Sequence, residues 1–277
     1  MKGIDLTQQE THFAFGRNWA SYAQSIDERQ IRQAVEALSR LLGGQRLEGK
    51  RFLDIGSGSG LHSLAASHLG AREVLATDID PDSVKTTQLL LNRYAVTANY
   101  RCEQASVFEL DPATCGRFDV VYSWGVLHHT GDLMRALRCA AAMVDRGQFV
   151  FALYRRIWMD WFWRLEKRWY AHASAGAQSA ARSVHSALFR GGLRLTGRRF
   201  ADYLQGYDSN RGMDYLHDMH DWLGGWPYES ISPEEVEKVM TQLGFSCVRA
   251  LTRKGRLFGR DPGFFGSGCD EYVYQRT

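Results

Sequence analysis

Between residues 51 and 154, short apolar runs alternate with segments whose apolar residues have helical spacing. The runs predict buried strands at 51–55, 73–78, 99–104, 118–123 and 147–154. The segments between them predict helices at 61–69, 81–94 and 132–144. Because strands that alternate with helices form parallel sheets, this pattern indicates an α/β fold.

The first predicted strand leads directly into a glycine-rich turn. Asp54 stands near the end of the strand, and Gly56, Gly58 and Gly60 follow at every second position. Glycine allows positive φ and lets a ligand approach the main chain without meeting a Cβ atom. The helix that starts at Leu61 offers unpaired N–H groups to an anion. A dinucleotide fingerprint would need glycine where Leu61 stands, and a tight turn without a ligand is the alternative left open.

The second predicted strand ends at Asp78, and Ile79-Asp80-Pro81 leads into the next helix. An acid at the tip of the strand after a glycine turn can accept both hydroxyl groups of a ribose. Asp80 stands directly before Pro81, which suits a helix N-cap. We therefore expect Asp78 to bind a nucleoside and Asp80 to cap the helix.

Further elements lie on either side of this alternating pattern. A helix at 31–42 is expected to pack on the edge of the sheet. Ser232-Pro233-Glu234-Glu235 has the N-cap, the proline and the early acids of a helix start. Two strands, 245–251 and 270–275, follow without a helix between them, and we expect them to be antiparallel.

The middle of the chain is basic and aromatic. Residues 151–212 contain ten Arg and one Lys against four acids, an excess of seven positive charges, whereas the whole chain carries +3. This asymmetry predicts an anionic substrate group or an acidic surface as a partner. The stretch 158–170 fits a membrane interface, a pocket for a hydrophobic acceptor, or a helix that packs its tryptophans on the sheet. We favour the last of these three.

The composition is that of an ordinary globular protein. With 277 residues and 44% hydrophobic content, the chain can form one large domain or one domain that carries an insertion. The five cysteines are scattered and lack C-x-x-C spacing, so neither a disulfide framework nor a zinc site is predicted. No apolar run approaches the length of a membrane span, and we expect a cytoplasmic location.

Two motifs together carry a family resemblance. The glycine turn at 54–60 resembles motif I of class I S-adenosylmethionine (SAM) dependent methyltransferases. The stretch 123–132, S-W-G-V-L-H-H-T-G-D, resembles motif IV of their small-molecule branch, which includes ubiquinone-biosynthesis O-methyltransferases. The resemblance implies a doubly wound, seven-stranded, mostly parallel sheet with a helical cap insertion. It also implies direct methyl displacement from SAM to an O, N or C atom, leaving S-adenosyl-L-homocysteine.

The resemblance also places the cofactor. In such proteins an N-terminal aromatic segment folds over the cofactor, although an anchor for an N-terminal arm is an equal alternative. The third strand is followed by a serine where the family often has an acid that contacts adenine. The predicted cofactor-binding residues are Phe15, Trp19, Asp54, Gly56, Ser57, Gly58, Gly60, Asp78, Ile79, Ser106, Val107, Ser123 and Trp124.

His128 is the predicted catalytic base, because it follows the fourth strand at the ligand edge of the sheet and titrates near neutrality. Capping of the next helix or stacking on adenine is the alternative for His128 or His129. Thr130 or Gly131 is expected to cap that helix.

The predicted substrate-binding residues are His128, Tyr207, Arg211, His217, Asp221, Trp222 and Tyr228. His217 and His220 share a helix face, yet no further ligands are identified, so no metal is expected.

We divide the chain into an N-terminal helical lid (1–47), a SAM-binding core (48–154), a helical substrate cap (155–228) and a last helix with an antiparallel hairpin (229–277). The expected partner is a small acceptor, anionic or apolar, bound by a monomer or homodimer. DNA is not expected. Methylation of RNA, of a lipid-linked acceptor at a membrane surface, and SAM binding without catalysis are the rival functions.

Overall fold

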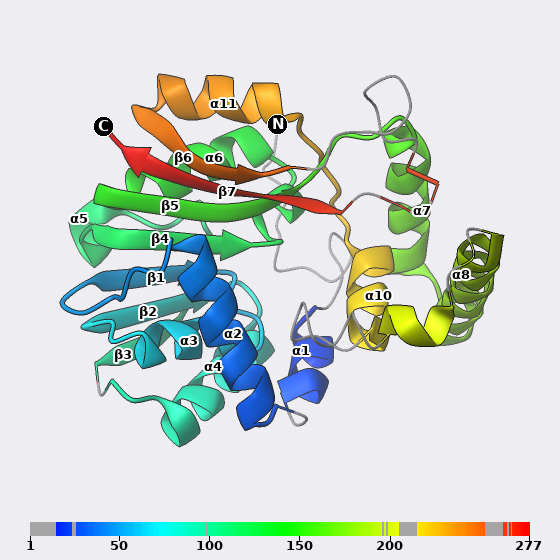
Figure 1. Ribbon diagram of the computed structural model, residues 1–277, viewed down its shortest axis with the longest axis horizontal. Helices are drawn as coiled ribbons and strands as arrows, with labels where there is room; N and C mark the ends of the chain where they lie inside the picture. The colour runs from blue at the N-terminus through cyan, green and yellow to red at the C-terminus, as the bar shows by residue number, and fades with distance from the viewer. Residues whose placement is uncertain are drawn as a thin grey trace.

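The computed structural model describes residues 15–23, 26–97, 99–195, 197, 199–204, 215–252, 263–264, 266 and 268–277. Its described strands form one seven-stranded sheet in the order β3-β2-β1-β4-β5-β7-β6 (Figure 1). The strands are β1 (Arg51–Ile55), β2 (Glu73–Asp78), β3 (Tyr100–Gln104), β4 (Phe118–Trp124), β5 (Val144–Tyr154), β6 (Phe245–Leu251) and β7 (Cys269–Arg276). Strands β1 to β5 pair in parallel, and β7 is antiparallel to both β5 and β6. The predicted fold class is confirmed.

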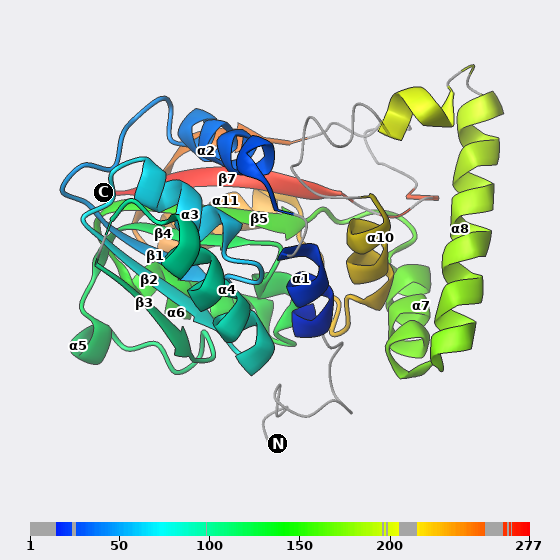
Figure 2. The ribbon, with the colours of Figure 1, turned by 90° about the horizontal axis from the view of Figure 1, so that it is seen from below.

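Helices cover both faces of the sheet and extend beyond one of its ends. They are α1 (Phe15–Ala23), α2 (Glu28–Leu41), α3 (Leu61–His68), α4 (Pro81–Tyr94), α5 (Pro112–Cys115), the 3₁₀ helix η1 (Leu127–His129), α6 (Leu133–Ala142), α7 (Asp160–His172), α8 (Ala175–Leu195), α10 (Tyr215–Gly224) and α11 (Pro233–Gln242). Figure 2 shows α7, α8 and α10 together, beyond the end of the sheet at which α1 lies.

Two apolar cores lie on the two faces of the sheet. One joins α6 and α11 to the sheet, and the other joins α2, α3 and α4 to it. The second core contains Leu38 of α2 together with Val150 of β5 and Val273 of β7. The prediction that this helix packs on the sheet edge is therefore wrong, because its apolar stripe lies on the face of the sheet.

The strand order reverses between β1 and β4. From β1 the chain runs outward to β2 and β3, and it then crosses back to β4 on the other side of β1. In open α/β sheets, ligands bind at such a switch point, beyond the carboxyl ends of the two strands. The turns after β1 and β4 are therefore the expected place for a site.

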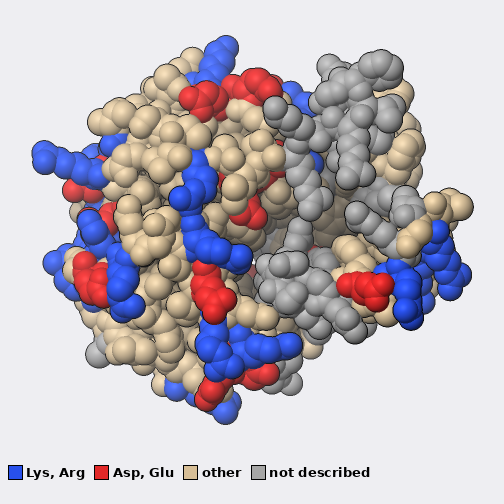
Figure 3. Space-filling model, viewed as in Figure 1, with Lys and Arg blue, Asp and Glu red and all other residues tan. Residues whose placement is uncertain are grey.

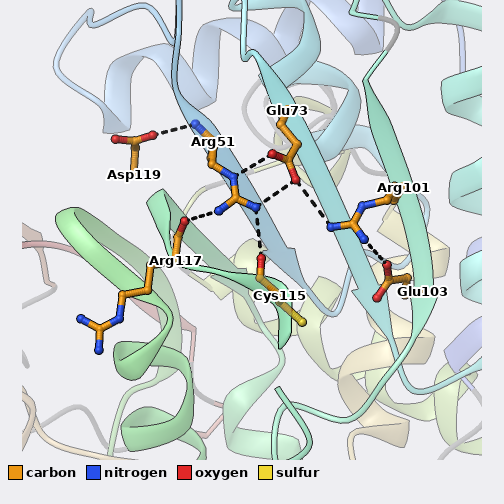
Figure 4. Close-up of polar contacts among 7 residues, drawn as sticks. All are labelled: Arg51, Glu73, Arg101, Glu103, Cys115, Arg117 and Asp119. Carbon is orange, nitrogen blue, oxygen red and sulfur yellow. Dashed lines mark hydrogen bonds and ion pairs between the residues drawn. The ribbon is translucent and has the colours of Figure 1, made fainter. Parts of the chain in front are cut away.

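The opposite, amino-terminal end of these strands is held by Arg51 (Figure 4). Its guanidinium donates two hydrogen bonds to Glu73 on β2, with Nε 2.7 Å from Oε2 and Nη2 3.0 Å from Oε1. It also donates to the carbonyl groups of Cys115 and Arg117, which lead into β4. The backbone N–H of Arg51 donates to Asp119. One side chain thereby links β1, β2 and β4 at the end away from the switch point.

Helix α6 begins one residue later than predicted. The side chain of Asp132 accepts a hydrogen bond from the N–H of Arg135 and caps the helix, so the expected cap at Thr130 or Gly131 is wrong. The hydroxyl of Thr130 instead donates to the carbonyl of Leu127 and closes η1. Asp is preferred for this position because its carboxylate accepts an otherwise unpaired N–H group.

Helices α7, α8 and α10 share a small core of their own. This core is linked to the sheet by Arg155, whose guanidinium lies 2.6 Å from the carboxylate of Asp270 in a buried ion pair. Trp163 is the one tryptophan of α7 that is buried, and Trp161 and Trp169 are exposed. Trp158 is exposed as well, and Trp163 packs against Trp222 of α10 in the cap core. The expectation that this stretch packs its tryptophans on the sheet is therefore wrong.

Candidate active site

The turn between β1 and α3 has the backbone that its glycines predict. Gly56, Gly58 and Gly60 have φ values of 76°, 54° and 81°, in the left-handed region that favours glycine. The N–H groups of Gly56 and Ser57 both donate to the carbonyl of Thr77, at 2.7 and 3.0 Å. The turn is therefore fixed to the end of β2.

The three glycines differ in what their missing Cβ leaves room for. A Cβ at Gly56 would lie 2.3 Å from the side chain of Val126, and one at Gly60 would lie 2.8 Å from the Cα of Thr87. These two glycines allow close packing within the protein. A Cβ at Gly58 would lie 3.2 Å from the indole of Trp19, so this glycine faces α1.

A cavity of about 860 Å³ lies at the switch point. Its wall combines the turns after β1, β2, β3 and β4 with α1 and with parts of α8 and α10. The predicted cofactor-binding residues on the wall are Phe15, Trp19, Asp54, Gly56, Ser57, Gly58, Asp78, Ile79, Ser106, Val107 and Trp124. A volume of this size suits a small-molecule site.

Gly60 and Ser123, also predicted to bind the cofactor, are not on this wall. Gly60 lies behind the turn, against α4. The buried hydroxyl of Ser123 donates to the carbonyl of Ile55 at 3.1 Å and joins β4 to β1. Both residues therefore shape the site from behind, and neither contributes to its surface.

Two carboxyl groups, the buried Asp54 and the partly buried Asp78, line the cavity beside the glycine turn. Burial raises the pKa of Asp54 to about 7, although the hydroxyl of Ser63 donates to its carboxylate at 2.6 Å. Burial also raises the pKa of Asp78 to about 6. The carboxylate of Asp78 accepts the N–H groups of Gly58 and Asp80, each at 2.9 Å. Desolvation outweighs these hydrogen bonds, so a cationic or hydroxyl-rich ligand would stabilise the ionised forms.

His128 does not have the surroundings of a catalytic base. Its ring is buried behind the cavity wall, 3.9 Å from the ring of Tyr154. Its Nδ1 accepts the backbone N–H of Tyr154 at 3.2 Å, so the ring proton lies on Nε2 and the basic nitrogen is already used. Burial also lowers its pKa well below the usual range. These contacts do not favour either predicted role of His128, as base or as substrate ligand.

The neighbouring His129 does line the cavity. Its Nδ1 lies 2.7 Å from the carbonyl oxygen of Pro227. Because a carbonyl can only accept, Nδ1 carries the ring proton and Nε2 is the basic nitrogen. The ring lies between Phe15 of the lid and Tyr154 of β5, at centroid distances of 5.4 and 5.3 Å. Sequence reasoning considered His129 only as a cap or as a stacking partner.

Helix α1 covers the cavity and connects the core to the cap. The N–H of Gly16 donates to the carboxylate of Asp80 at 3.0 Å. The side-chain amide of Asn18 donates to Asp221 of α10 at 2.7 Å. Phe15 and Trp19 line the cavity between these two contacts.

Helices α8 and α10 close the far side of the cavity, which is acidic. Asp218, Asp221 and Trp222 of α10 and His185 of α8 lie on this wall. Burial raises the pKa of Asp218 to about 6 and that of Asp221 well above its usual range. The sequence indicated Asp221 and Trp222, but it missed Asp218 and His185. Two acids one helical turn apart were the available signal.

The other predicted substrate residues are not part of the described wall. Tyr228 is buried in the cap core, and its hydroxyl donates to Asp160 at 2.7 Å. Tyr207, Arg211 and the side chain of His217 lie outside the described residues. Nδ1 of His220 lies 2.8 Å from the hydroxyl of Tyr170. Among the described side chains, no three of His, Cys, Asp or Glu form a group that could hold a metal ion.

Comparison with known proteins finds relatives of part of the chain. Residues 53–152 match a family model described as a methyltransferase domain. The match covers 100 of the 277 residues, so the core of the chain is similar to methyltransferase domains.

The relatives include ubiquinone biosynthesis O-methyltransferases. The protein of Rhodopseudomonas palustris (strain BisB5) is 30% identical over 161 residues, which are 58% of each chain. That of Xanthomonas campestris pv. campestris (strain B100) is 36% identical over 105 residues, 38% of this chain and 43% of the relative. The chain thus spans about half the length of the curated relatives it matches.

Solved structures share the fold at low sequence identity. PKMT2 from Rickettsia typhi, in complex with AdoHcy, has a TM-score of 0.58 at 14% identity, covering 88% of this chain and 53% of that one. Magnesium protoporphyrin IX methyltransferase (ChlM) from Synechocystis PCC 6803, with bound SAH, has a TM-score of 0.52 at 16% identity, covering 90% and 84%. At such identities the likeness shows the fold alone.

The raised pKa of Asp54 predicts a pH-dependent difference in stability between wild type and Asp54→Asn. Because the folded-state pKa of about 7 lies above the unfolded value, Asp54 stabilises the fold below about pH 4 and loses this contribution as the pH rises through 7. From pH 4 to 7.5, wild type should therefore lose on the order of 3 kcal/mol of unfolding free energy relative to Asp54→Asn.

Urea denaturation of both ligand-free proteins at several pH values measures this difference. The comparison cancels the effect of His62 and His128, whose lowered pKa values act in the opposite direction. A difference that stays constant with pH, or that changes in favour of wild type, would contradict an elevated pKa at Asp54.

Proposed function

We propose that this chain is a SAM-dependent methyltransferase that acts on a small acceptor bound between its lid and its cap. The observation that carries the proposal is the shared cavity, in which the glycine turn and Asp78 meet the acidic and aromatic wall of α10. A cofactor and an acceptor can bind side by side in such a cavity. A cytoplasmic location and a monomeric or homodimeric state stay predictions.

The residues present suit SAM. Asp78 would accept the ribose hydroxyls, because its carboxylate is already oriented by the N–H groups of Gly58 and Asp80. Ser106 and Val107, after β3, would lie beside the adenine. The glycine turn exposes main chain to the methionine end, where Asp54 offers a carboxylate to the ammonium group. SAM supplies the activated methyl group for direct displacement.

For its own part, the chain would position the acceptor and exclude water. Phe15 and Trp19 cover the cavity from α1, and Trp222 closes it from α10. The Asn18–Asp221 hydrogen bond joins these two covers. Holding the two reactants in line within a closed site removes much of the entropic cost of a bimolecular reaction.

Calorimetric titration with S-adenosylhomocysteine tests the proposal directly. The full chain should bind this nucleoside and should not bind NAD. Asp78→Asn should weaken binding by about tenfold to a hundredfold, since hydrogen bonds to a charged acceptor are lost. The control is Asp82→Asn, because Asp82 is an exposed acid in the first turn of α4 and does not line the cavity. Uptake of NAD, or no uptake of either ligand, would refute the proposal.

A base is needed where the nucleophile carries a proton, and we propose His129 for this role. Its Nε2 is the basic nitrogen, and its ring is oriented by the carbonyl of Pro227. His128 instead supports the wall, because its Nδ1 holds the backbone of Tyr154 at the end of β5.

Paired variants separate the two histidines. With tyramine as a phenolic probe acceptor, His129→Ala should release S-adenosylhomocysteine about a hundredfold more slowly at unchanged SAM affinity. Its rate should rise steeply with pH as the phenol ionises. His128→Asn, whose side-chain oxygen can still accept the N–H of Tyr154, should stay within about threefold of wild type. Equal losses in the two variants would contradict the assignment.

The wall also bears on the charge of the acceptor. Seven acids line the described cavity: Glu36, Asp54, Asp78, Asp80, Asp218, Asp221 and Glu271. Arg40 is the one Arg or Lys on that described wall. The basic residues that suggested an anionic acceptor, such as Arg164, Arg168 and Arg194, are exposed on α7 and α8. We therefore propose a neutral or cationic acceptor with hydrogen-bond donors.

Asp221 is the residue that we expect to select such an acceptor. Its Oδ1 accepts from Asn18, whereas its buried Oδ2 has no hydrogen-bond partner within the described part of the chain. In protein saturated with S-adenosylhomocysteine, calorimetry should show tyramine binding at least tenfold more tightly than 4-hydroxyphenylacetate, with neutral tyrosol between them. Asp221→Asn should remove most of this preference. Exposed Asp202→Asn should keep it, and tighter binding of the anion to wild type would contradict the proposal.

A further inference from the structure

The outer side of α7 exposes an unusual number of large apolar side chains. Trp158, Trp161, Leu165 and Trp169 are 70%, 65%, 62% and 53% exposed. Single exposed apolar residues are normal on a protein surface, but a contiguous apolar patch marks an interaction site. Three exposed tryptophans within twelve residues therefore need a partner.

These side chains lie on one helix face. Trp161, Leu165 and Trp169 are four residues apart, so they lie along a single stripe, and Trp158 comes just before the first turn. The opposite side of the same helix is also apolar, because Trp163 and Tyr170 are buried in the cap core. Helix α7 is thus apolar on two sides, and only the side with Trp163 and Tyr170 is packed in the cap core.

The charges beside the stripe are positive. Arg164 and Arg168 are exposed on α7, whereas Glu166 is partly buried and Lys167 is fully buried on the inner side. Figure 3 shows blue Lys and Arg side chains at the end of the molecule where α8 lies, with red Asp or Glu side chains directly beside them. Next to the stripe itself, Arg164 and Arg168 favour an anionic partner.

We propose that the α7 face, defined as Trp158, Trp161, Leu165 and Trp169 with Arg164 and Arg168, docks on an anionic lipid bilayer. Tryptophan prefers the headgroup region because its ring is apolar and its N–H is polar. Arginine pairs with lipid phosphate. None of the described helices has the length and apolarity needed to cross a bilayer, so the face lies on the membrane surface. A second copy of the chain fits less well, since a symmetric contact would bring the arginines of both copies together.

The α7 face lies close to the active-site cavity. On the inner side of α7, Trp163 packs against Trp222 at a centroid distance of 4.6 Å, and Trp222 lines the cavity. One helix, about 10 Å across, therefore separates the docked face from the acceptor wall. If methyl transfer is the function, docking brings the cavity beside the bilayer, which suits an acceptor with an apolar lipid anchor. The docking itself does not depend on methyl transfer.

Sedimentation of the full chain with vesicles tests the proposal. The protein should bind vesicles of phosphatidylcholine and phosphatidylglycerol in equal parts, with a blue shift of tryptophan fluorescence, and should bind phosphatidylcholine alone more weakly. The triple variant Trp158→Ala, Trp161→Ala, Trp169→Ala should bind at least tenfold less to both. Arg164→Ala with Arg168→Ala should lose about tenfold or more on the anionic vesicles alone.

Leu89→Ala is the matched control, because Leu89 is 60% exposed on α4, away from the α7 face. It should bind vesicles like wild type. Circular dichroism and S-adenosylhomocysteine binding should be unchanged in every variant, which separates loss of docking from loss of the fold or of the proposed function. Three results would overturn the proposal: no binding to anionic vesicles, an equal loss in Leu89→Ala, or a solution dimer that the triple variant dissociates.

Discussion

The turn from β1 into α3 is the constraint on which the site depends. The chain must reverse at the end of a buried strand without covering the edge of the sheet, so the backbone adopts positive φ at three positions. Thr77 at the end of β2 accepts two N–H groups of this turn, and Asp78, the next residue, accepts a third. The same hydrogen bonds therefore fix the turn and orient the carboxylate that faces the cavity. Any side chain at Gly56 would displace Val126 and separate the turns after β1 and β4.

The carboxyl groups of the cavity wall lower the stability of the ligand-free protein when they are ionised. Asp54 and Asp221 are buried and Asp78 is partly buried, and desolvation raises their pKa values because less water stabilises the charge. Within the described residues their partners are neutral groups: the hydroxyl of Ser63, backbone N–H groups and the amide of Asn18. A ligand that carries positive charge or hydroxyl groups can supply the missing stabilisation. The wall therefore favours ligands with positive charge or hydroxyl groups, although the net charge of the whole chain is +3.

Much of the core could be predicted because its strands and helix ends depend on local patterns. The bounds of β1, β2 and α4 agree with the prediction, since buried strands need apolar runs and Asp80-Pro81 provides an N-cap and a proline in the first turn. The site was harder to predict. His128 and His129 are adjacent in sequence, but η1 turns by about 120° per residue and sends one ring behind the wall and the other into it. No sequence pattern distinguishes these two positions.

Helix α7 is a second case in which the spacing of apolar residues does not predict which side is buried. Apolar residues on both of its sides give no clear amphipathic signal, and burial of all its tryptophans was a reasonable expectation. In the structure the inner side meets α10, and the outer side meets no element that the structure describes. The Nζ of Lys167 lies 3.8 Å from the ring centroid of Trp222, behind the acceptor wall, and burial lowers the pKa of Lys167 to about 7. Because Trp163 of α7 packs against Trp222, one helix separates the outer face of α7 from the cavity wall.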